Sequence, residues 1–95
     1  MANPSVQAVK LTLSGDCCID GLSQHHELLL RALEDGTGID LDLSKISRMD
    51  TAGLQLLLVF VIEMKRQNRA LHVSAVSEIV KQCATSAGVV ELLGL

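Results

Sequence analysis

Aromatic side chains are almost absent from this sequence: its 95 residues include one phenylalanine and no tryptophan or tyrosine. Proteins that bind single-stranded nucleic acid stack the bases on aromatic side chains and present a basic surface. This chain has a formal net charge of -3 at pH 7, so it lacks both features. We therefore expect no nucleic-acid partner.

A long apolar segment is also missing. The most apolar run, Leu54 to Ile62, is interrupted by Gln55 and reaches only about half of the 20 or so residues that a membrane-spanning helix needs. Met1 to Ser5 is short and polar, and alternation rather than an apolar region follows it, so no secretory signal is expected. The length suits a single domain over residues 1–95. We expect a soluble, cytoplasmic protein without direct membrane insertion.

The sequence lacks the residue spacings of metal and catalytic sites. Its three cysteines, two of them adjacent at Cys17 and Cys18, form neither a disulfide framework nor a C-x-x-C pair. His25 and His26 are neighbours on a predicted helix, where side chains point about 100° apart, and no second ligand pair accompanies them. There is no nucleophile motif and no phosphate-binding loop. The sequence predicts no metal, no cofactor and no enzymatic activity.

Alternation of apolar and polar residues predicts strands, and apolar residues three or four apart predict helices. Strands are expected at 6–13, 39–43 and 71–76, with a short antiparallel strand at 17–19. Helices are expected at 22–34, 52–67 and 78–87, the last between a Ser77 cap and a Gly88 stop. Each main strand has one polar face, unlike strands of doubly covered parallel sheets. The predicted fold class is α/β, a small two-layer sandwich with a mixed sheet of about four strands and helices mainly on one face.

Each of these helices has a predicted core-facing stripe, which in the third helix consists of Ile79, Val80, Cys83, Ala84 and Ala87. In the first helix the stripe consists of Leu22, His26, Leu29 and Leu33. In the second and longest helix it consists of Leu54, Leu57, Leu58, Val61 and Ile62. The longest helix is apolar beyond this stripe, which indicates deeper burial, a binding surface or scattered exposed aliphatic residues. We predict that a partner contacts Gln55, Leu56, Val59, Phe60 and Glu63. An exposed edge strand, or Leu56, Val59 and Phe60, can equally serve a homodimer.

A polar segment leads into this helix and ends in Asp50-Thr51. The first four N–H groups of a helix have no intrahelical partners, so Asp and Thr at this point can cap the helix. The positive end of the helix dipole favours a negative group, and a phosphate on Thr51 would be well placed there. Thr51 is therefore either a phosphorylation candidate or a helix-start residue alone.

The segments Asp42-Leu43-Ser44 and Met49-Asp50-Thr51-Ala52-Gly53-Leu54, with the order of elements around them, resemble the STAS domain. This is the fold of anti-sigma factor antagonists and of sulphate-transporter tails, and the likeness covers essentially the whole chain. In that family an Asp-Ser-Ser-Gly-Leu or Asp-Thr-x-Gly-Leu segment opens the helix after the third strand. Its first hydroxyl residue is the phospho-acceptor in partner-switching regulators, and by position that residue here is Thr51. The resemblance implies a non-catalytic protein-binding module of bacterial signal transduction.

The resemblance also implies which segment meets the partner. The contact residues expected in the loop and at the helix start, besides Thr51, are Ser44, Ser47, Arg48, Met49, Asp50, Ala52 and Gly53. The implied partner is a regulatory protein, either an anti-sigma-type serine/threonine kinase or a chemotaxis-type signalling protein. Many phosphorylated antagonists have Ser where this chain has Thr51 followed by Ala52. Thr-containing versions also resemble the STAS subunit of bacterial phospholipid-transport ABC systems, for which the implied partner is the ABC ATPase.

Overall fold

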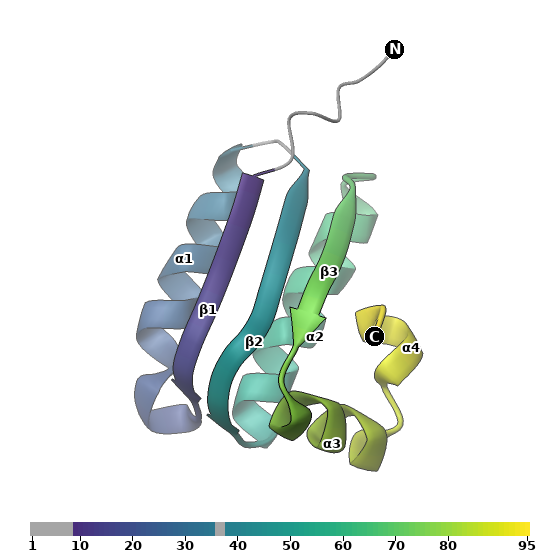
Figure 1. Ribbon diagram of the computed structural model, residues 1–95. Coiled ribbons are helices and arrows are strands. Elements are labelled where there is room, and N and C mark those ends of the chain that lie inside the picture. The colour runs from purple at the N-terminus through teal and green to yellow at the C-terminus, as the bar shows by residue number, and fades with distance from the viewer. Residues whose placement is uncertain (1–8, 36–37) are drawn as a thin grey trace.

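The computed structural model describes residues 9–35 and 38–95 (Figure 1). Its strands are β1 (Val9–Cys17), β2 (Ile39–Met49) and β3 (Leu71–Val76). Its α-helices are α1 (Leu22–Asp35), α2 (Thr51–Arg66), α3 (Glu78–Ala87) and α4 (Val90–Leu93), and a 3-10 turn at Ile19–Gly21 precedes α1. Residues 6–8 of the first predicted strand lie outside the described residues.

The three strands form one parallel sheet in the order β1-β2-β3. Ile39 in the central strand lies opposite Val9 on one side and Leu71 on the other. Parallel neighbours need crossover connections, and right-handed crossovers that add strands in one direction place their helices on one face. Figure 1 shows this arrangement, with α1 and α2 behind the sheet, α3 below the lower end of β3 and α4 to the right of β3. The predicted small α/β class is confirmed.

The prediction of a mixed sheet of about four strands is wrong for the described part of the chain, where the sheet has three strands and all are parallel. The expected antiparallel strand at 17–19 does not form. Instead β1 continues to Cys17, which lies opposite Met49. The register shifts between Thr12 and Ser14 and again after Gly15, which has a φ of 78°. Such bulges break the two-residue alternation without ending the strand, and glycine tolerates the left-handed backbone found at position 15.

The polar segment predicted as a loop between the strand at 39–43 and the helix at 52–67 is likewise mostly strand, because β2 extends to Met49. Ile46 and Met49 are buried, and the two residues between them are exposed. Buried positions three residues apart do not fit regular alternation, and they fall where β2 shifts register against β1. This irregular half of β2 carries the chain directly to the start of α2.

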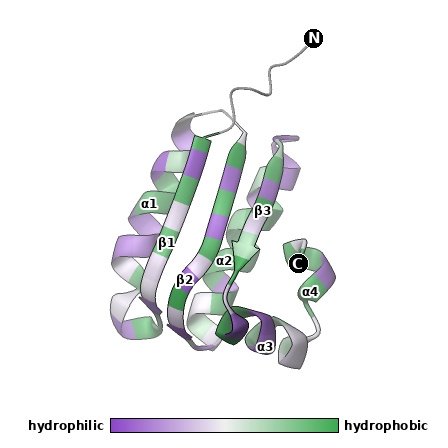
Figure 2. Ribbon diagram, in the orientation of Figure 1, coloured by the Kyte–Doolittle hydropathy of each residue, from purple (hydrophilic) through white to green (hydrophobic). Residues whose placement is uncertain are grey.

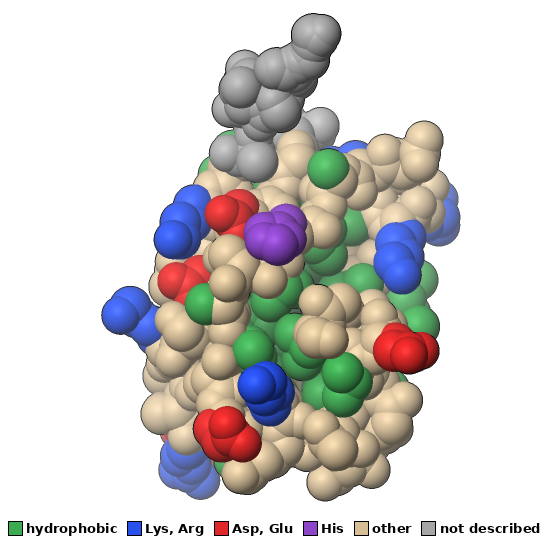
Figure 3. All heavy atoms as spheres, turned by 45° about the vertical axis from the view of Figure 1, so that its right-hand side comes forward, with side chains coloured by type: hydrophobic (Ala, Val, Ile, Leu, Met, Phe, Trp, Pro, Cys, Tyr) green, Lys and Arg blue, Asp and Glu red, His purple; other side chains and the backbone are tan. Residues whose placement is uncertain are grey.

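Hydrophobic and hydrophilic residues alternate along much of β1 and β2, as Figure 2 shows, so one face of the sheet is apolar and the other is polar. The buried side includes Leu13, Ile39, Leu41 and Leu43, which pack under α1 and α2. The outer side carries Lys10, Thr12 and His72, all exposed. Figure 3 shows charged groups and a histidine over this side. Within the described residues no helix is long and apolar enough to cross a membrane.

Helix α1 is rotated relative to the prediction. His25 rather than His26 faces the core, is 6% exposed, and places its Nε2 2.8 Å from the carbonyl oxygen of Asp16. His26 is exposed, so its predicted place in the core stripe is wrong. Helix α3 has the predicted bounds and ends at Gly88, which adopts the left-handed conformation with a φ of 72°. Ser77 precedes α3, but its side chain makes no capping hydrogen bond.

Candidate functional site

Asp50 follows the end of β2, and its side chain is hydrogen-bonded both to the first turn of α2 and to the connection between β1 and α1. Its backbone is extended, and its Oδ1 accepts a hydrogen bond from the N–H of Gly53 at 3.0 Å, which caps α2. Its Oδ2 accepts a hydrogen bond from the N–H of Ile19 at 3.1 Å, in the connection between β1 and α1. One carboxylate therefore holds the first turn of α2 against the end of β1, and this sets the position of the neighbouring Thr51.

These contacts favour the ionised carboxyl group. The hydrogen bond from Gly53 and then that from Ile19 lower the pKa of Asp50 below its usual value. A carboxylate at a helix N-terminus also lies at the positive end of the helix dipole. Asp50 therefore carries its negative charge at neutral pH, directly beside Thr51.

The stability that depends on Asp50 should be lost in acid. Because its pKa is lower in the folded protein, the charge contributes stability above the unfolded value of about 3.9, and this contribution disappears as the pH falls through the folded pKa. We expect Asp50→Asn to be less stable than wild type at pH 7 and the gap to close toward pH 2 in thermal melts. A gap that stays constant with pH would contradict this account. Glu63 and Asp42 also have lowered pKa values but are present in both proteins, so the difference isolates Asp50.

Gly53 lies where α2 touches β1. A Cβ atom at this position would overlap the carbonyl oxygen of Cys17 and lie 2.9 Å from its carbonyl carbon and 3.0 Å from its Sγ. Only a residue without a side chain permits this approach. Gly53, predicted to contact a partner, is buried instead, and we correct the prediction for this residue. Met49 is also largely buried, but it lines the groove beside the helix start.

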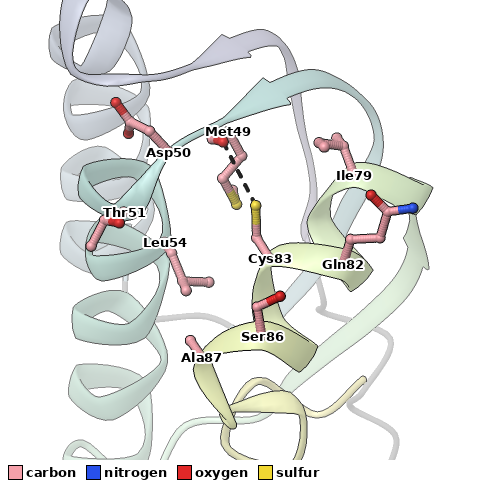
Figure 4. A pocket seen from close by; sticks show the side chains of 9 residues that line it. All are labelled: Met49, Asp50, Thr51, Leu54, Ile79, Gln82, Cys83, Ser86 and Ala87. Carbon is pink, nitrogen blue, oxygen red and sulfur yellow. Dashed lines mark hydrogen bonds between the residues drawn. The ribbon is translucent and has the colours of Figure 1, made fainter.

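Thr51 is the first residue of α2 and is exposed. It lies at the rim of a groove of about 590 Å³ between α2 and α3 (Figure 4). In Figure 4 the side chains of Met49, Leu54 and Cys83 point into this groove, and the Sγ of Cys83 lies 3.6 Å from the carbonyl oxygen of Met49. The remaining lining residues are Asp50, Ile79, Gln82, Ser86 and Ala87. An apolar floor with a polar rim can accept an apolar side chain of another protein.

The contribution of α3 to this groove was absent from the sequence-based prediction. Cys83, Ser86 and Ala87 are small residues spaced three and four apart, so they share one face of α3 and leave room beside α2. That spacing was the available signal. It could not be interpreted without knowing that α3 packs next to the start of α2.

The predicted loop residues do not all reach the site. Ser47, Arg48 and Asp50 line a second hollow of about 370 Å³, together with the connection after β1. Ser44 lies roughly 20 Å along β2 from Asp50. Its N–H and Oγ donate hydrogen bonds to Oδ1 of Asp42 at 2.9 and 2.6 Å. Ser44 therefore stabilises the Asp42 carboxylate and lies away from the start of α2. These hydrogen bonds lower the pKa of Asp42.

The residues predicted to face a partner along α2 separate into two groups. Gln55, Leu56 and Val59, with Ala52, line a groove of about 380 Å³ between α1 and α2. Phe60 is 2% exposed and lies in the core, so its prediction as a contact residue is wrong. Ile62, predicted to lie in the core, is 55% exposed. The rotation of α2 about its axis accounts for both corrections.

Glu63 is engaged within α2. It accepts hydrogen bonds from Nε of Arg66 at 3.0 Å and from Nε2 of Gln67 at 2.8 Å, and it forms an ion pair with the guanidinium of Arg66. These bonds lower the pKa of Glu63 to about 2. The Glu63 carboxylate is therefore ionised, and its oxygens are already bound to Arg66 and Gln67 at the C-terminal end of the helix.

No cluster of three or more metal-ligating side chains occurs in residues 9–35 and 38–95. The thiol of Cys17 is buried, and this burial raises its pKa to about 11. A thiol with a raised pKa is mostly protonated and unreactive at neutral pH. The chemistry available at the helix start is therefore hydrogen bonding and charge at Asp50 and Thr51, together with apolar contact in the groove.

A parallel sheet that presents an exposed helix start beside an apolar groove defines a domain suited to binding another protein. The family model described as "Mlab, STAS domain" matches residues 2–94. The chain therefore belongs to the STAS domain family, as its Asp-Thr-Ala-Gly-Leu segment indicated. A comparison with curated proteins gave no match. STAS domains are generally non-catalytic modules that mediate protein–protein interactions.

Proposed function

We propose that this STAS domain is a cytoplasmic partner-switch regulator of the anti-sigma factor antagonist type in bacterial signal transduction. It binds a regulatory protein, an anti-sigma-type serine/threonine kinase or a chemotaxis-type signalling protein, through the start of α2. Phosphorylation of Thr51 gates this contact. The observation that supports the proposal is the exposed Thr51 at the rim of the α2–α3 groove, held in place by the capping carboxylate of Asp50.

The physical effect of the phosphate differs between the free domain and the complex. Phosphorylation adds about 1.5 to 2 negative charges at pH 7. In the free domain this charge lies in water at the positive end of a helix dipole, which tolerates it. In a complex the phosphate would be removed from water next to the charged Asp50, at a cost of several kcal/mol. The expected result is a retained fold and a lost complex.

Replacing Thr51 with glutamate should therefore keep the domain folded and weaken partner binding by about tenfold to a thousandfold, which corresponds to roughly 1.4–4 kcal/mol. Affinity capture from the native host with mass spectrometry would identify the partner and report the state of Thr51. Calorimetric titration of that partner would then give the affinity. Thr85→Glu is the matched control, because Thr85 is an exposed threonine on α3 that does not line the groove. Equal affinity of Thr51→Glu and wild type would refute the gate.

A second candidate is a constitutive subunit docked on the ATPase of a phospholipid-transport ABC system. The observation that favours it is the Thr51-Ala52 pair, which departs from the Ser of many phosphorylated antagonists. In this case Thr51→Ala alone should weaken the complex, because the hydroxyl would be part of a permanent contact. Phosphatase treatment should change nothing, and the gene should lie beside transporter genes.

A further inference from the structure

One exposed line of side chains runs the whole length of α2. It consists of Thr51, Gln55, Val59, Ile62 and Arg66, which we call the α2 ridge. Their spacing of four, four, three and four residues keeps them on one side of the helix. Val59 is 64% exposed and Ile62 is 55% exposed, so the middle of the ridge is apolar and its two ends are polar. This is the distribution of a small interface, with an apolar centre and a polar rim.

We propose that the α2 ridge is a homodimer interface, in which two copies pack their α2 helices antiparallel about a two-fold axis. A two-fold axis uses the same surface twice, so the ridge must complement itself. When Thr51 is placed opposite Arg66 of the partner subunit, Gln55 lies opposite Ile62 of the partner subunit. Val59 then lies next to the axis. The inference does not depend on the regulatory partner or on phosphorylation.

The shape of the surface supports this register. Gln55 and Val59 line the groove of about 380 Å³ between α1 and α2, whose other residues include Leu22 and Leu56. The antiparallel register places Ile62 of the partner subunit over this groove. An exposed aliphatic side chain and an apolar hollow thus occur on one face at positions that the symmetry brings together. Each copy supplies one Ile62 side chain and one groove, so the same contact forms twice across the two-fold axis.

The charges of α2 select the antiparallel direction. Its N-terminal end carries the ionised Asp50, which is already hydrogen-bonded to Gly53 and Ile19. Its last turn carries Lys65 and Arg66, and Arg66 is also paired with Glu63 of its own helix, so the last turn keeps an excess of positive charge. An antiparallel pair brings the carboxylate end of each helix to the cationic end of the other, and it also opposes the two helix dipoles. A parallel pair would place Lys65 and Arg66 against their own copies. Like charges brought together in this way repel.

Dimer formation would compete with the binding of another protein at the start of α2. Thr51 and Gln55 belong to the ridge and also border the two grooves at the start of α2. A protein bound at that start and a second copy bound at the ridge would exclude each other. The ridge presents only two strongly exposed aliphatic side chains, which places the dimer among small, reversible interfaces.

Sedimentation velocity from about 10 µM to 1 mM protein tests the interface over the range of weak association. Wild type should shift from monomer to dimer as concentration rises. Val59→Glu and Ile62→Glu should raise the dimer dissociation constant at least about tenfold, because each would bury two unpaired charges. Leu92→Glu is the matched control: Leu92 is 51% exposed on α4, outside the ridge, and its substitution should leave the dimer unchanged.

A charge exchange tests the register. Thr51→Glu should tighten the dimer about 2- to 30-fold, because it adds two symmetric ion pairs with Arg66. Arg66→Glu should weaken it, and the double variant Thr51→Lys with Arg66→Glu should restore it. A monomer at every concentration, or a dimer insensitive to Val59→Glu, overturns the interface. A dimer that responds to Val59→Glu but not to the charge exchange overturns the antiparallel register.

The outcomes separate this inference from the proposed function. If Thr51→Glu weakens partner binding while every protein stays monomeric, only the dimer fails. If the dimer follows the charge exchange while Thr51→Glu binds the partner normally, only the phosphorylation gate fails. Circular dichroism of each variant confirms that the differences arise in a folded domain.

Discussion

Replacing Gly53 with alanine is expected to remove a large part of the folding stability of this domain. The new methyl group would overlap the carbonyl oxygen of Cys17. The methyl carbon is bonded directly to the backbone of α2 and the oxygen belongs to the backbone of β1, so neither can turn aside as a flexible side chain would. Helix α2 is held there by the hydrogen bond from Gly53 to Asp50, and β1 is held by its pairing with β2. The helix would have to move away from the sheet, at a cost of about 3 kcal/mol or more. Thermal melts should show Tm lower by roughly 12–24 °C.

Gly88→Ala separates this steric effect from the general effect of removing a glycine. Gly88 has a φ of 72°, but a Cβ there would meet no atom within 4 Å. Alanine at that position should therefore cost only the backbone strain, about 1–2 kcal/mol. Similar losses in the two variants would show that the contact between Gly53 and Cys17 is not what holds α2 in place.

The second large effect is expected at Phe60, whose neighbour Val59 serves as its matched control. Phe60→Ala should reduce the free energy of unfolding by about 3–5 kcal/mol, because the side chain is 2% exposed and belongs to the hydrophobic core. Val59→Ala should change it by no more than about 0.5 kcal/mol, because Val59 is exposed on α2. Denaturant unfolding at low protein concentration measures both as monomers. If Val59→Ala were the more costly change, the orientation of α2 would be wrong.

These two predictions bear on function through the placement of Thr51. Gly53 sets how closely the first turn of α2 approaches β1, and Phe60 anchors the middle of the same helix in the core. With Asp50 capping the helix, Thr51 is presented at a defined position on the rim of the α2–α3 groove. In the proposed function a kinase must reach Thr51 and a partner must bind beside it, and both steps would benefit from such a rigid support.

Features that depend on a few neighbouring residues were predicted well. The segment from Asp50 to Leu54 identified the family and the start of α2, because capping needs particular side chains at particular backbone positions. The alternation in 71–76 predicted β3, and Gly88 ended α3 as expected. In each case the residues that determine the structure lie within about one turn of it.

Features that depend on packing were not predicted. Helix α2 is apolar around most of its circumference, so the sequence could not show that Phe60 rather than Ile62 faces the core. His25 and His26 differ by the same rotation in α1. The extensions of β1 to Cys17 and of β2 to Met49 contain bulges, and bulges remove the alternation by which strands are recognised.

The sequence alone therefore determined the family, the α/β class and the place of Asp50 and Thr51 at a helix start. Those properties follow from hydrogen-bonding side chains, glycines and hydrophobic periods that act over short distances along the chain. The tertiary structure decided the parallel three-stranded sheet, the rotation of α1 and α2, and the groove that α3 forms beside Thr51. These depend on residues far apart in sequence, whose contacts are chosen by how well whole surfaces fit together.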